Sequence, residues 1–175
     1  MENIEMKWKL EDPVGLRGLL RQMDSIQSQY RHQQEDVYFQ IPEGRLKLRL
    51  EDEKTPCLIQ YDRPDEASPR VSEYSLRWLE QPEEVNQLFQ TYQTITRVVK
   101  WRELYLFRNV RIHLDEVMEL GWFAEFESVI SDEYPPEVAK QNFEELYHQL
   151  SPYLGEPQSV SYLDLILLKK DMGKP

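Results

Sequence analysis

The sequence contains one cysteine and few glycines, has more acidic than basic residues, and has no long apolar run. The single Cys57 excludes an internal disulfide and a cysteine-rich metal cluster. A net charge of −11, from 21 basic and 32 acidic residues, disfavours binding to nucleic-acid phosphates. No stretch approaches the roughly 18 apolar residues of a membrane-spanning helix, and the first residues lack the pattern of a signal peptide. We therefore expect a cytoplasmic protein that binds neither nucleic acid nor membranes.

The 175 residues are expected to form one domain spanning positions 1–175. No Gly/Ser-rich linker and no repeat divides the chain, and its six glycines occur singly. Hydrophobic residues make up 40% of the chain, enough for a sizeable core and too many for a disordered one.

Alternating and β-branched or aromatic segments predict eight strands. They are expected at residues 5–10, 36–41, 45–50, 57–61, 71–79, 95–107, 110–117 and 123–130. Three helices are expected, one from Asp12 as N-cap to about Asp24, one after Pro82 and one after Pro136. Many strands and few helices in one domain predict a mostly β, α+β fold whose antiparallel sheet closes, or nearly closes, into a barrel.

The charged residues of the strands alternate with apolar ones. Arg45, Lys47 and Arg49 share one strand face because residues two apart point the same way. Similar charged faces contain Glu5 with Lys7, Lys100 with Arg102, Arg111 with His113 and Asp115, and Glu125 with Glu127. Such faces point to water in ordinary half-exposed sheets, or they line the polar interior of a wider barrel whose apolar outside is covered by amphipathic helices.

A polar interior of this kind would suit one class of ligand. Arginine forks and lysine ammonium groups together neutralise a ligand with three or four negative charges, such as a polyphosphate. Carboxylates do not bind phosphate directly, but they hold Mg²⁺ or Mn²⁺, which bridge to phosphate oxygens. Basic and acidic strands around one cavity therefore indicate a metal–polyphosphate complex.

Seven short motifs follow one another along nearly the whole chain. They are Asn-Ile-Glu-Met-Lys at 3–7, Gly-Arg-Leu-Lys-Leu-Arg at 44–49, Tyr-Asp-Arg-Pro-Asp at 61–65, Ser-Glu-Tyr at 72–74, Lys-Trp-Arg at 100–102, Arg-Ile-His-Leu-Asp at 111–115 and Leu-Gly-Trp-Phe-Ala-Glu-Phe-Glu at 120–127. In order and spacing they resemble the CYTH domain of class IV adenylate cyclases and thiamine triphosphatases, also called triphosphate tunnel metalloenzymes.

The resemblance implies an eight-stranded antiparallel barrel or tunnel with a polar lumen and a few covering helices. It implies that phosphate is bound by Lys7, Arg45, Lys47, Arg49, Lys100, Arg102 and Arg111, with Arg63 joining from a loop edge. It implies that Mg²⁺ or Mn²⁺ is held by Glu5, Asp115, Glu125 and Glu127. Among these residues, Glu5, Lys7 and Arg111 are expected to be catalytic.

The first motif departs from the family pattern Glu-x-Glu-x-Lys. Glu5 and Lys7 match it, but position 3 is Asn, a weaker ligand for a hard cation than a carboxylate, which puts a second metal site in doubt. His113 has no second histidine nearby and is expected to be a hydrogen-bonding lumen residue rather than a metal ligand. Cys57 is expected to be a buried strand residue.

The resemblance leaves several functions open. A class IV adenylate cyclase converts ATP to cyclic AMP and pyrophosphate, and this is the expected activity. The alternatives are a triphosphatase acting on inorganic triphosphate, thiamine triphosphate or a nucleoside triphosphate, and a catalytically silent triphosphate-binding module, which Asn3 favours.

Overall fold

The computed structural model describes residues 2–62 and 69–173. Its strands are β1 Glu2–Lys9, β2 Gln27–Phe39, β3 Arg45–Glu51, β4 Cys57–Asp62, β5 Arg70–Trp78, β6 Thr94–Phe107, β7 Val110–Val117, β8 Gly121–Val129 and β9 Pro157–Gln158. Its helices are α1 Pro13–Gln22, α2 Pro82–Thr91, α3 Pro136–Leu150, the short 3₁₀ helix Ser151–Tyr153, and α4 Tyr162–Met172. No helix in the described part of the chain is long and apolar enough to cross a membrane.

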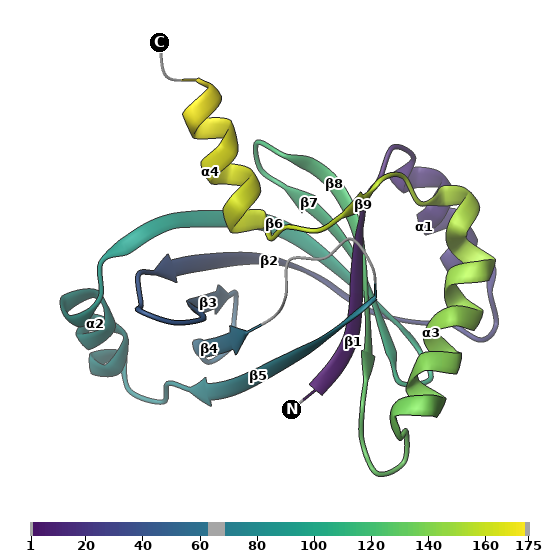
Figure 1. Ribbon diagram of the computed structural model, residues 1–175, viewed down its shortest axis with the longest axis horizontal. Helices are drawn as coiled ribbons and strands as arrows, with labels where there is room; N and C mark the ends of the chain where they lie inside the picture. The colour runs from purple at the N-terminus through teal and green to yellow at the C-terminus, as the bar shows by residue number, and fades with distance from the viewer. Residues whose placement is uncertain (1, 63–68, 174–175) are drawn as a thin grey trace.

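The strands form one closed antiparallel barrel (Figure 1). Their order is β5-β4-β3-β2-β6-β7-β8-β1, and β1 closes the ring by pairing with β5. Residues 2–5 of β1 pair with β5, whereas Lys7 and Trp8 pair with the two-residue strand β9. The expected eight-stranded, mostly β barrel is therefore confirmed, with one short extra strand.

Much of the hydrophobic core lies outside the barrel, between the sheet and the helices. The largest apolar cluster joins Leu16 and Leu20 of α1 and Phe143 of α3 to outward-facing strand residues such as Ile112 and Phe126. Helix α2 covers the outer faces of β2 and β3. Helix α4 instead packs on Val98 of β6 and Phe123 of β8, which lie on the inward faces that also carry Lys100 and Glu125. Figure 1 shows α1 and α3 on one side of the barrel and α2 at the far end. Because the apolar strand faces are covered by helices, the charged faces of these strands turn inward.

Two segments differ from the expectation. Strand β2 begins at Gln27 rather than near residue 36, and its polar first half is held by pairing with β6. That half carries no alternating apolar residues, so its sequence does not have a strand pattern. Helix α4 was not expected, because its apolar residues surround the helix instead of forming one stripe. A capping box between Ser161 and Asp164 starts it.

Candidate active site

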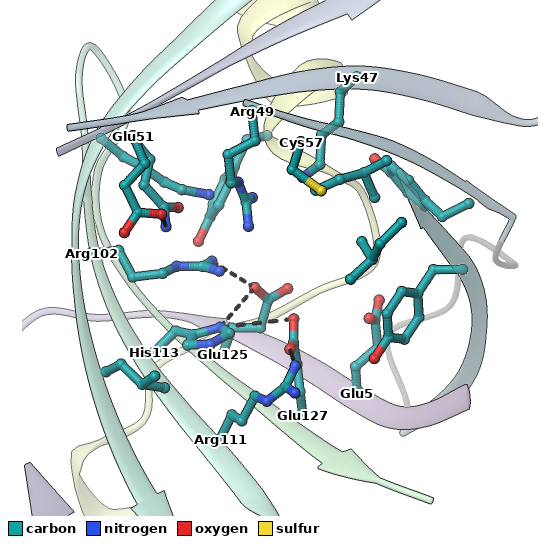
Figure 2. A pocket seen from close by; sticks show the side chains of 18 of the residues that line it. Glu5, Lys47, Arg49, Glu51, Cys57, Arg102, Arg111, His113, Glu125 and Glu127 are labelled. Carbon is teal, nitrogen blue, oxygen red and sulfur yellow. Dashed lines mark hydrogen bonds and ion pairs between the residues drawn. The ribbon is translucent and has the colours of Figure 1, made fainter. Parts of the chain in front are cut away.

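The barrel encloses a cavity of about 440 Å³, and all eight barrel strands contribute residues to its wall. Of the residues expected in the site, nine line it: Glu5, Lys7, Lys47, Arg49, Lys100, Arg102, Arg111, Glu125 and Glu127. Figure 2 shows the basic residues of β3 on one side of the cavity and the acidic residues of β8 on the other. Strand geometry brings these residues together because each contributes from the inward face of its strand.

Two expected residues have other positions, and a third is not described. Arg45 does not line the cavity, and its guanidinium Nη2 lies 3.1 Å from Asp164 Oδ2 of α4. Asp115 is completely buried in the wall and paired with cations. Arg63 lies outside the described residues.

Asp36, which the sequence reasoning missed, anchors the basic side of the cavity. Arg49 binds its carboxylate through two hydrogen bonds of 2.8 Å, Lys47 Nζ lies 3.0 Å from Oδ2, and Lys100 Nζ lies 3.5 Å from the same oxygen. Burial alone would raise the pKa of Asp36, but the charges of Arg49, Lys47 and Lys100 hold it well below its usual value. One carboxylate therefore holds Arg49, Lys47 and Lys100 together, which leaves this group with an excess of positive charge.

A second buried carboxylate, Asp115, orients Arg102. The guanidinium Nε and Nη2 of Arg102 donate to the two Asp115 oxygens at 2.7 and 2.6 Å, and the Tyr162 hydroxyl donates to Oδ2 at 2.9 Å. Burial opposes ionisation of Asp115, yet the charges of Arg102 and Lys100 lower its pKa. Arg102 Nη2 also donates to Glu125 Oε2 at 3.1 Å, so it links the basic and acidic sides of the cavity.

The positions of the residues on the acidic side of the cavity follow from strand register. Across β1, β8 and β7, Lys7 is opposite Glu125 and Glu125 is opposite His113. The next row along these strands contains Glu5, Glu127 and Arg111. Both rows face the cavity, so one patch of wall presents three carboxylates and an imidazole among cations.

Glu125, Glu127 and His113 are close enough to hold one ion. One oxygen from each carboxylate and one ring nitrogen all lie within 4.8 Å of one another. Burial opposes ionisation of Glu125, but Lys7 and the neighbouring His113 and Arg102 keep its pKa well below the usual value. Burial, followed by the charge of Arg102, lowers the pKa of His113, so its ring is neutral at neutral pH. Two carboxylate oxygens and an imidazole nitrogen this close together are a donor set that suits a divalent metal ion.

Asn3 also faces the lumen. It is 3% exposed, lines the cavity, and its side-chain oxygen has no hydrogen-bond partner among the described residues. Asn3 lies two residues before Glu5 on β1, so a carboxylate at this position would stand beside the acidic row.

The wall formed by β4 and β5 is different in character. It presents Ile59, Tyr61, Tyr74, Leu76 and Trp78 to the cavity. Trp78 is 54% exposed, so this wall reaches the open mouth. An aromatic and aliphatic surface beside a cationic one suits a ligand with an organic group attached to its phosphates.

Comparison with known proteins identifies the family. The CYTH domain matches residues 1–156, and the chain belongs to the CYTH domain family. A protein of Methanocaldococcus jannaschii named "Putative adenylate cyclase MJ0240" is 26% identical over 176 residues, covering 94% of this chain and 98% of that protein.

Two solved structures are similar to the chain in fold. The PH1012 protein from Pyrococcus horikoshii OT3 has a TM-score of 0.76 at 22% identity and covers 93% of this chain and 98% of its own. A structure from Vibrio parahaemolyticus titled "putative adenylate cyclase" has a TM-score of 0.72 at 17% identity. The match covers 94% of this chain and 97% of that protein.

Proposed function

We propose that the protein is a divalent-metal-dependent enzyme that acts on a triphosphate, most like a class IV adenylate cyclase. The observation that carries the proposal is the cavity wall, where Lys47, Arg49, Lys100 and Arg102 face a group of carboxylates and an imidazole. These cations are already fixed by Asp36 and Asp115, so they need little reorganisation when an anion enters.

In this proposal the basic side binds the phosphate chain. Arg49 and Arg102 offer forked donors, and Lys47 and Lys100 add compact positive charge. Glu125 and Glu127 would hold the metal ion. When bound, that ion neutralises charge on the phosphates and stabilises the leaving pyrophosphate. Arg111, which is half-buried at the cavity wall, would contact the phosphates where they meet the acidic side.

The apolar β4–β5 wall favours a nucleotide over inorganic triphosphate. Cyclisation requires the ribose 3′ hydroxyl to lie in line with the α-phosphorus and its leaving group, so the nucleoside must be positioned. In this proposal Trp78 and Leu76, which line the cavity, contact the base while the cations hold the phosphates. The open position of Trp78 favours the alternative, a triphosphatase, since an exposed wall orients a nucleoside only loosely.

Product analysis separates these activities. Purified protein is incubated with ATP, inorganic triphosphate or thiamine triphosphate, each with Mg²⁺ or Mn²⁺, and the products are resolved by chromatography. Cyclic AMP and pyrophosphate from ATP would support the cyclase. Orthophosphate together with the matching diphosphate (ADP, pyrophosphate or thiamine diphosphate) would identify a triphosphatase. Triphosphate binding without turnover would identify a silent module.

A matched pair of variants tests the nucleotide wall. Trp78→Ala should raise the KM for ATP several-fold and leave binding of inorganic triphosphate unchanged. Trp101→Ala, which changes an indole that does not line the cavity, is the control. Equal effects of Trp78→Ala on both ligands would contradict contact with the base.

A further inference from the structure

The orientation of His113 is not explained by hydrogen bonding. The residue is 5% exposed, and its Nδ1 has no hydrogen-bond partner among the described residues. Its neighbours are Glu125 Oε2 at 3.7 Å and Glu127 Oε1 at 3.8 Å. Both distances exceed the roughly 3.2 Å limit of an N–H···O hydrogen bond. This buried nitrogen points at two carboxylates without a hydrogen bond to either. An atom bound by all three groups would explain its position.

Asp115 is poorly available as a metal ligand. Both of its oxygens are engaged by Arg102, and one also accepts from Tyr162. A cation that bound Asp115 would compete with a buried, forked ion pair, and breaking such a pair is costly. Figure 2 shows Glu125, Glu127 and the His113 ring converging, with Arg102 and Arg111 on either side.

We propose that His113 is a direct ligand of the divalent ion together with Glu125 and Glu127, and that this nitrogen makes the site prefer Mn²⁺ to Mg²⁺. The inference rests on the proposed metal-dependent function. Mg²⁺ strongly favours oxygen donors, whereas imidazole suits first-row transition ions. His113 also completes a set of three protein ligands in a wall where Asn3 supplies no charge.

Pulsed electron paramagnetic resonance of the protein loaded with substoichiometric Mn²⁺, without substrate, tests the contact directly. Wild-type protein should show modulation from a directly bound ¹⁴N, and labelling with [¹⁵N]histidine should replace it with the ¹⁵N pattern. His113→Asn should abolish the nitrogen signal and raise the Mn²⁺ Kd at least tenfold by calorimetry. The Mg²⁺ Kd should change less than twofold.

The other two histidines provide the control. His32 contacts Glu51 near the cavity mouth, and His148 is exposed on α3. The double variant His32→Asn/His148→Asn has His113 as its sole histidine and should keep the nitrogen signal. This variant tests the inference even if His113→Asn fails to fold. Absence of nitrogen coupling in wild-type protein or in this double variant would overturn the inference. Persistence of the coupling in His113→Asn, or equal weakening of Mn²⁺ and Mg²⁺ binding, would do the same.

The two proposals fail differently. ATP turnover without nitrogen coupling overturns the His113 assignment and leaves the proposed function standing. Nitrogen coupling without turnover of any triphosphate supports the assignment and overturns the proposed enzyme.

Discussion

Lys47 should take up a proton when triphosphate binds. Its ammonium is largely buried and donates to Asp36 Oδ2 at 3.0 Å. Burial, together with the nearby charges of Arg49 and Lys100, lowers the pKa of Lys47 from 10.5 to about 7, because these effects outweigh the opposing attraction of Asp36. Above pH 7 the free protein therefore holds Lys47 mostly neutral. A bound triphosphate brings several negative charges close to this amine and raises its pKa again.

The size of the uptake follows from these pKa values. At pH 8.5, a pKa of about 7 leaves about 3% of Lys47 protonated, and a return to 10.5 in the complex would protonate about 99%. Lys47 should then contribute the uptake of close to one proton per triphosphate bound. Near pH 7 the expected uptake falls to about half a proton, because half of Lys47 already carries one.

Isothermal titration calorimetry of metal-free protein with inorganic triphosphate measures this uptake. Titrations at pH 8.5 in two buffers with different ionisation enthalpies give the number of protons exchanged. Lys47→Arg keeps the charge but cannot deprotonate, so uptake should fall by close to one proton while binding persists. Lys140→Arg on α3, away from the cavity, is the control. Equal uptake in wild-type protein and Lys47→Arg would refute the reasoning.

Three further substitutions test the two sides of the cavity. Arg49→Ala should weaken metal-free triphosphate binding by roughly 1.5–3 kcal/mol. It should also lower the melting temperature, because Asp36 loses its forked partner. Unchanged affinity by calorimetry would contradict a phosphate contact. Glu127→Gln should abolish metal-dependent turnover and keep triphosphate binding intact or stronger; wild-type rates across Mg²⁺ and Mn²⁺ concentrations would exclude a metal role. Asn3→Glu should tighten Mn²⁺ binding and move the metal dependence of activity to lower concentration, whereas an unmoved titration curve would place position 3 away from the ion.

Strand alternation predicted much of the cavity wall. Lys47 and Arg49 on β3, Lys100 and Arg102 on β6, and the acidic pair on β8 share inward faces because strand side chains repeat every two residues. Alternation alone left open whether these faces met water or a lumen. The helices show that the charged faces line a lumen, because the apolar residues of the helices cover the opposite strand faces.

Other parts of the site depend on features that alternation does not encode. It places Arg45 on the same face as Lys47, but it does not show that Arg45 lies beyond the cavity, beside Asp164. Asp36 stands first in an apolar segment, and only the register of β2 with β3 puts it opposite Arg49. Tyr162 belongs to a helix whose sequence has no amphipathic pattern, so its contact with Asp115 required the three-dimensional structure.

The position of β1 has a consequence for folding. This strand carries Asn3, Glu5 and Lys7, yet its partner β8 lies about 120 positions further along the chain. Contacts between such distant segments form slowly, because a long loop must close before they are made. Until β1 seats between β8 and β5, the other seven strands form an open sheet with two unpaired edges and no enclosed cavity. Closure of the barrel and assembly of the site are therefore the same event, so a chain that has folded only locally has neither.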